Sequence, residues 1–258
     1  MNDKQAIKYH LVYLSIGELT DTKLNNLQWK IRLAVQRLHK RYYKHPWIFI
    51  TEADIQCALY AELLGSLMKA RKTIVRDANS NKINDWEYEV LTRPLHAELS
   101  SSRRKTTEFV DLCIIEPSVF EFWIKKTKFN RGDREVPIWT WGPSWPENAI
   151  GIEIKFNRWV LKRKAYSYKS KRERFTGRWK DLRYSLISDL DKLLRYKRGW
   201  LIFVDHHSLL RNKEEWREFM DDVIRYSNYG RLKKTLNAYY LSPKLGRALS
   251  YKSPGSSF

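Results

Sequence analysis

The stretch IGIEIKF, residues 150–156, is apolar and β-branched enough to form a buried strand, yet it carries Glu153 and Lys155. The stretch FVDLCII, residues 109–115, has the same character and carries Asp111. Because side chains alternate along a strand, Glu153 and Lys155 share one face. An isolated buried carboxylate is costly, whereas two facing carboxylates are held ionised by a divalent cation. We therefore expect a metal site where Asp111 lies beside the second strand.

An aspartate on one strand followed by Glu-x-Lys on the next resembles the PD-(D/E)XK nuclease superfamily. The resemblance covers Thr51 to Asp205 and departs from the family signature at Val110, where the family has proline. It implies an α/β fold with a restriction-endonuclease-like core, in which helices flank a central mixed sheet. We expect an N-terminal helical arm at residues 1–50, followed by a nuclease domain at 51–258 with a tryptophan-rich insertion at 117–148.

The resemblance also assigns roles to residues of the two strands. Asp111 and Glu153, together with the backbone carbonyl of Ile154, would hold a hard cation, Mg²⁺ or Mn²⁺. Lys155 would orient the attacking water or help to deprotonate it. Hydrolysis of the phosphodiester would leave a 5′-phosphate and a 3′-hydroxyl.

The family commonly supplies a further glutamate from the helix before its first strand. A helix is predicted from Thr51, a suitable N-cap, to about Ala70. Glu52 matches the family's placement more closely than Glu62, which is the second choice. Glu52 is also explained as a first-turn acid that complements the helix dipole, so both interpretations stay open.

Charge indicates a polyanionic partner. The chain has 49 Lys and Arg against 29 Asp and Glu, for a formal net charge of +20. Such a surplus is typical of proteins that bind nucleic acid. The densest cations follow Lys155 and are interleaved with aromatics, as phosphate-backbone binding requires. The candidate nucleic-acid contacts are Arg158, Lys162, Arg163, Lys169, Lys171, Arg172, Arg174 and Arg178.

Two other regions carry cations beside apolar or aromatic residues. A predicted helix at 23–44 has an apolar stripe and a basic face, which either is simply solvated or contacts phosphates. In the insertion at 117–148, tryptophans alternate with lysines and arginines. They either stack on bases or cover the sheet and a dimer contact.

Further patterns predict the rest of the fold. Strands are expected at 88–99, 200–204 and, at a sheet edge, 236–241, with helices at 180–196 and 214–227 and a tail from Tyr251. A strand, helix and strand in succession from 149 to 204 imply a crossover within a mixed sheet. Cys57 and Cys113 are read as reduced core residues, and His206 and His207 as loop residues rather than metal ligands.

The sequence gives no indication of a membrane-spanning or secreted protein. The chain has no run of about 18 apolar residues and begins without a signal-peptide core, so we expect a cytoplasmic protein without membrane attachment. We expect a Mg²⁺- or Mn²⁺-dependent endodeoxyribonuclease, a hydrolase of double-stranded or branched DNA whose domain is capable of forming a homodimer. The alternative is a non-catalytic nucleic-acid-binding module of the same fold. The complete set of Asp111, Glu153 and Lys155 favours the enzyme.

Overall fold

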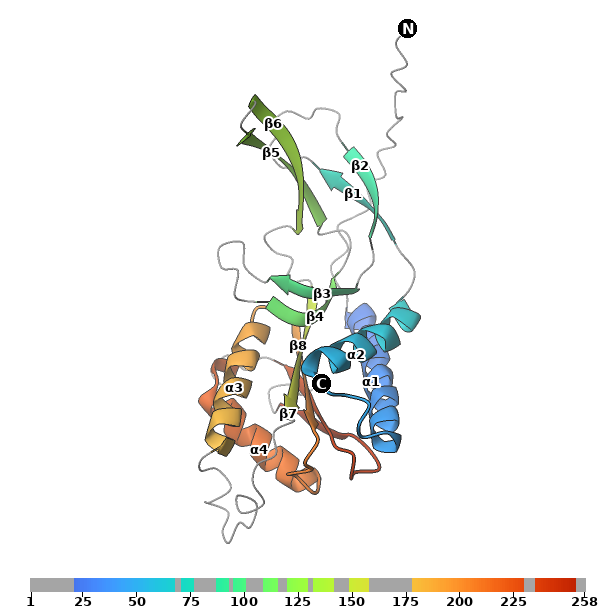
Figure 1. Ribbon diagram of the computed structural model, residues 1–258, viewed down its shortest axis with the longest axis vertical. Helices are drawn as coiled ribbons and strands as arrows, with labels where there is room; N and C mark the ends of the chain where they lie inside the picture. Colours follow the sequence, from blue (N-terminus) through green and yellow to red (C-terminus); the bar gives the residue numbers. More distant parts are fainter. Residues whose placement is uncertain are drawn as a thin grey trace.

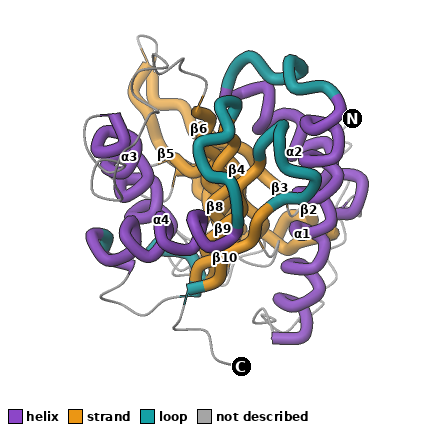
Figure 2. Tube along the Cα trace, turned by 90° about the horizontal axis from the view of Figure 1, so that it is seen from below, coloured by secondary structure: helices purple, strands orange, loops and turns teal. Residues whose placement is uncertain are grey.

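The computed structural model shows a six-stranded mixed sheet with helices on both faces (Figures 1 and 2). This confirms the predicted α/β class with a mixed, helix-flanked sheet. The structure describes residues 21–67, 71–76, 87–92, 95–100, 109–115, 120–129, 132–141, 149–157, 178–229 and 235–253.

The strand order of the sheet is β10-β9-β8-β7-β4-β3. The strands β7, β8 and β9 are parallel, whereas β3, β4 and β10 pair antiparallel with their neighbours. Helices α3 and α4 connect the parallel strands, as the predicted crossover requires. The bounds are β3 Leu95–Ser100, β4 Phe109–Ile115, β7 Ala149–Asn157, α3 Arg178–Leu193, β8 Arg198–Asp205, α4 Lys213–Tyr226, β9 Leu236–Leu241 and β10 Leu249–Lys252.

The two faces of β7 belong to two different cores. Ile150, Ile152 and Ile154 pack with α1 (Asp21–Lys44) and α2 (Glu52–Leu67), while the alternate residues face α3. A Cβ on Gly151 would lie 2.7 Å from the Tyr196 ring, so glycine permits this close approach. The predicted alternation of β7 is therefore confirmed.

Helix α1 is an integral layer of this fold rather than an arm. Ile31, Val35, Leu38 and Tyr42 are fully buried and belong to the same core cluster as the sheet residues Ile152 and Ile202. The apolar stripe read from the sequence thus packs on the sheet instead of standing apart from it. The division into an arm at 1–50 and a domain from 51 does not describe α1.

The expected strand at 88–99 is two strands in different sheets. Strand β2 (Glu87–Thr92) pairs with β1 (Arg71–Arg76), whereas β3 joins the six-stranded sheet. Pro94 stands between β2 and β3 and has no N–H for a sheet ladder, which is the physical reason for a break there.

The C-terminal part of the sheet also differs from expectation. Strand β9 is not an edge strand, because it lies between β8 and β10. Strand β10 occupies residues that were expected to be partly a tail, and its Leu249 and Tyr251 are buried. A four-residue strand with alternate exposed residues gives a weak sequence signal.

The expected insertion contains a separate antiparallel pair, β5 (Phe120–Phe129) and β6 (Gly132–Trp141). Figure 1 shows this pair and the pair β1 and β2 beyond the same end of the six-stranded sheet. Strand β1 lies next to β5. Trp123 belongs to β5, Trp139 and Trp141 belong to β6, and Trp145 lies outside the described residues. Their expected stacking on bases stays a prediction.

Candidate metal centre

The carboxylate of Asp111 attaches the end of β4 to β7. The antiparallel register pairs Leu112 with Ile152, so its continuation by one residue sets Asp111 opposite Glu153. Instead of a further ladder bond, the backbone N–H of Ile154 donates to Asp111 Oδ2 at 2.6 Å. The structure thus brings Asp111 and Glu153 to one point, as their sequence context predicted.

The first turn of α2 brings Glu52 to the same place. Thr51 caps the helix, since its Oγ1 accepts from the N–H of Asp54 at 3.2 Å. Glu52 Oε2 accepts from the N–H of Phe156 at 3.0 Å, and its charge raises the pKa of Asp111. Of the two candidate helix acids, Glu52 is therefore the one that lies near Asp111, and its role there stays a prediction. Glu62 is instead bound by Arg37 at 2.8 Å and Arg41 at 3.1 Å.

Helix α3 covers Glu153 with a charged pair that the sequence analysis did not single out. Glu153 is 1% exposed, and Lys192 Nζ donates to its Oε2 at 3.2 Å. Lys192 also lies 3.3 Å from Asp189 Oδ1, and Lys155 Nζ lies 3.3 Å from Asp189 Oδ2. Asp189 thus holds both lysines beside the buried acid.

Burial and crowding change the protonation of the two strand acids. Burial, with the adjacent Asp111 as the next cause, raises the pKa of Glu153 to about 9. Burial also raises the pKa of Asp111 to about 6, against the hydrogen bond from Ile154. Burial opposes the charge of Lys192, but Glu153 and Asp189 outweigh it and raise the pKa of Lys192.

Glu153 is left with one oxygen unused. Its Oε1 is buried and accepts no hydrogen bond from the described residues. Buried polar atoms without a partner are rare in folded proteins, so this oxygen calls for a missing partner. A cation beside Glu153 and Asp111 would supply one and would remove the mutual repulsion of the two acids.

The donor set fits a hard divalent cation. No group of three His, Cys, Asp or Glu side chains converges closely enough to hold a metal ion in the part of the chain that the structure describes. Mg²⁺, however, is usually bound by one or two carboxylates and keeps several waters. Asp111 and Glu153 provide the two carboxylates, and the carbonyl of Ile154 and the carboxylate of Glu52 would be further oxygen donors.

The partners on α3 carry a signal that could have been found in the sequence. Asp189 stands three residues after Leu186 and four before Leu193, which are both fully buried, so an acid there interrupts an apolar stripe. Lys192 follows Asp189 by three residues, the spacing of an intrahelical pair. Gln56 left no such signal, yet its Nε2 donates to the backbone carbonyl of Asp111 at 2.7 Å.

Asp205 is a second buried acid with a different environment. It is fully buried at the end of β8, and both of its oxygens accept two hydrogen bonds each. The four donors are Asn157 Nδ2 at 3.0 Å, the N–H of His207 at 3.0 Å, the N–H of Leu209 at 2.7 Å and the hydroxyl of Tyr240 at 2.6 Å. Asp205 therefore organises a turn and needs no further partner.

Three further groups of residues were singled out in the sequence: the predicted nucleic-acid contacts, the histidine pair and the two cysteines. The predicted nucleic-acid contacts Arg158, Lys162, Arg163, Lys169, Lys171, Arg172 and Arg174 lie outside the described residues, and Arg178 is the first residue of α3. His206 and His207 follow the strand as expected, and His206 Nδ1 lies 3.1 Å from the hydroxyl of Tyr42. Both cysteines are free, but Cys57 is exposed, so only Cys113 is the expected core residue.

No protein-family model, curated protein or solved structure matches this chain. Among the described helices, none has the length and apolar character needed to cross a membrane.

Proposed function

We propose that this protein is a Mg²⁺- or Mn²⁺-dependent endonuclease that hydrolyses phosphodiester bonds of DNA on a restriction-endonuclease-like core. The supporting observation is that Asp111 lies opposite Glu153, with Glu52 bound to the neighbouring backbone of Phe156 and Lys155 held by Asp189. The four candidate residues come from three elements of the chain. The same four were expected from the resemblance to PD-(D/E)XK nucleases.

Each residue of this centre has a role that its position supports. Asp111, which is partly exposed, and Glu153, which is buried, would hold the cation with the carbonyl of Ile154. When bound, the cation supplies Lewis-acid polarisation of the phosphate and a water of lowered pKa. Lys155, held by Asp189, would orient the attacking water and stabilise charge on the phosphate oxygens. The new water O–P bond replaces the P–O3′ bond, which leaves a 5′-phosphate and a 3′-hydroxyl.

One observation favours the alternative, a non-catalytic nucleic-acid-binding module. Glu153 already contacts Lys192 at 3.2 Å, and Asp111 already accepts from Ile154, so part of the acid cluster is neutralised by the protein itself. A module without chemistry would keep this network for stability alone. The orphaned Oε1 of Glu153 argues against a purely structural network, because it stays without a donor among the described residues.

A cleavage assay separates the two functions. Supercoiled, linear, branched and single-stranded DNA are incubated with the protein and Mg²⁺, Mn²⁺ or a chelator. The enzyme predicts products with a 5′-phosphate that require the metal and disappear in Glu153→Gln. DNA binding without cleavage under every metal condition would support the module instead.

A further inference from the structure

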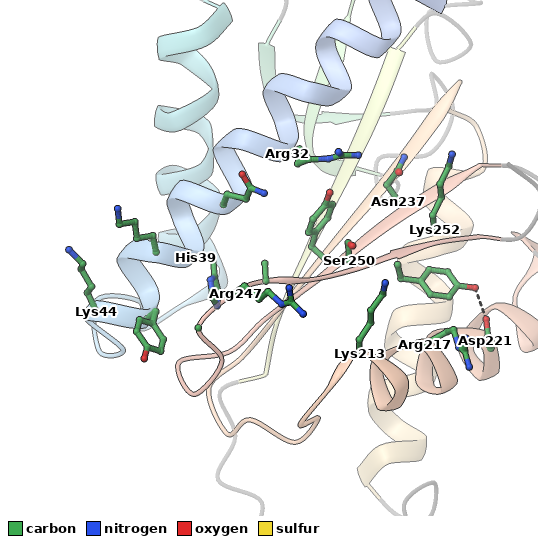
Figure 3. A pocket seen from close by; sticks show the side chains of 17 residues that line it. Arg32, His39, Lys44, Lys213, Arg217, Asp221, Asn237, Arg247, Ser250 and Lys252 are labelled. Atoms are coloured by element: carbon green, nitrogen blue, oxygen red, sulfur yellow. Dashed lines mark hydrogen bonds between the residues drawn. The ribbon is translucent and has the colours of Figure 1, made fainter. Parts of the chain in front are cut away.

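A large basic groove crosses the exposed edge of the sheet, away from the acids. It encloses about 1170 Å³ between α1, the edge strand β10 and the first turns of α4 (Figure 3). Helix α1 contributes Arg32, Lys40 and Lys44 to its lining. Figure 3 shows Arg32 and Lys213 reaching from opposite walls toward the space around Arg247. The other lining cations are Arg217 of α4 and Lys252 of β10.

These cations have no counter-ions within the described residues. None of the seven forms an ion pair there, whereas Arg37 and Arg41 of the same helix α1 are paired with Glu62. The one acid in the lining, Asp221, already accepts a hydrogen bond from Tyr251 at 2.7 Å. Like charges that gather around a hollow repel one another, so an anionic ligand would be bound favourably.

The geometry favours an extended anion over a small one. Arg32, Gln36, Lys40 and Lys44 follow one another at four-residue spacing on the groove side of α1. Twelve residues of helix extend over roughly 18 Å, which is about five phosphate steps of one DNA strand along the duplex axis. A free phosphate or a single nucleotide would leave most of this row without a partner.

A second hollow lies between the segment that follows α1 and the end of β7. It encloses about 460 Å³ and is lined by Trp47, Ile50, Phe156 and His206, among others. Trp47 follows the end of α1 at Lys44, and the backbone of Phe156 binds Glu52. Trp47 is 79% exposed, so its ring is available for a base to stack on. Aromatic side chains therefore lie close to the backbone that binds Glu52.

We propose that this groove binds the phosphate backbone of DNA outside the segment that is cut. The choice of nucleic acid as the ligand rests on the proposed function, but the binding itself requires neither the metal nor Glu153. Arg32, Lys40 and Lys44, which α1 contributes to the groove, are therefore a phosphate-contacting surface. The groove contributes affinity for DNA, whereas Asp111 and Glu153 act in the cleavage step.

The test compares two double variants that each remove two positive charges from exposed arginines. Arg32→Gln with Arg247→Gln alters the groove, and Arg195→Gln with Arg225→Gln is the matched control outside the groove lining. Fluorescence anisotropy measures binding of a labelled 20-base-pair duplex over a salt series with metal omitted. The slope of log affinity against log salt should fall by about 1.8 in the groove variant, at about 0.9 per lost contact, and change less in the control.

Further measurements distinguish the groove from other surfaces that could bind DNA. Equal slopes in the two variants would overturn the groove as the binding surface. The proposal would also be overturned if Lys169→Gln with Lys171→Gln removed the whole salt dependence of DNA binding. It would likewise be overturned if the groove variant lost binding to phosphatidylserine-containing vesicles but bound DNA as wild type does. If the first groove variant does not fold, Lys44→Gln with Lys213→Gln replaces it. Failure of the proposed nuclease would show separately, as absent metal-dependent cleavage by a wild-type protein that still binds through the groove.

Discussion

Two buried carboxylates on neighbouring parallel strands have opposite surroundings. Asp205 at the end of β8 accepts four hydrogen bonds, so its two oxygens are satisfied. Glu153 in β7 receives one from Lys192, and its Oε1 receives none from the described residues. Glu153 also has a second acid, Asp111, beside it, which helps to raise its pKa. Burial alone thus marks neither acid as functional. The two acids differ because the hydrogen bonds of Asp205 are complete, whereas those of Glu153 are not.

The largest effect is expected from removing either strand acid. Asp111→Ala and Glu153→Ala should each abolish cleavage while nearly preserving the fold and DNA binding, because each loses a metal ligand rather than a phosphate contact. Gel assays of cleavage, anisotropy and thermal melting measure the three properties. Metal-dependent cleavage at the wild-type rate in both variants would rule out this centre.

The next largest effect concerns the lysines around Glu153. Lys155→Ala should lower the single-turnover rate by about 10²–10⁴-fold with little change in metal affinity, because the lysine acts on the water and the phosphate. Lys192→Ala should cost about 10–100-fold through weaker metal binding, because Lys192 only orients Glu153. Full recovery of the Lys155 variant at high metal concentration would reduce Lys155 to a structural counter-ion.

Asp205→Asn tests the other member of the comparison. The variant should lose about 1–3 kcal/mol of unfolding free energy for each donor left without an acceptor, while metal affinity stays unchanged. Urea denaturation measures the stability, and calorimetric titration measures metal binding. The isosteric Glu153→Gln should show the reverse pattern, with lost metal binding and no loss of stability. Equal losses of metal binding in both variants would break the distinction between the two acids.

The pH dependence of the metal-free protein tests the burial of Glu153 without any measurement of activity. The unfolded chain releases the Glu153 proton near the ordinary pKa of 4.5, whereas the folded protein keeps it to about 9. The unfolding free energy contributed by this group is therefore present below 4.5 and lost as pH rises toward 9. Glu153→Gln should flatten this slope relative to wild type in urea melts with chelator. Cation binding should strengthen with pH and release protons, which calorimetry in buffers of different ionisation enthalpy detects.

Local sequence alone determined the main elements of this protein. The β-branched stretches around Asp111 and Glu153 are strands, and residues 23–44 and 180–196 are largely helical as expected, because strand alternation and helical periodicity are written in neighbouring residues. Strand alternation also placed Glu153 and Lys155 on one face. The register then brought Asp111 opposite Glu153, a pairing that the two acids in apolar runs had already indicated.

Only the tertiary structure decided which distant residues meet. Glu52 rather than Glu62 reaches the acids, because the start of α2 meets the end of β7 while Glu62 faces the arginines of α1. Asp189 and Lys192 reach Glu153 through the crossover that lays α3 over β7. The unpaired cations of α1 form a groove because β10 completes the sheet beside them. Pairings across many residues depend on packing and hydrogen bonding between elements, which no local pattern encodes.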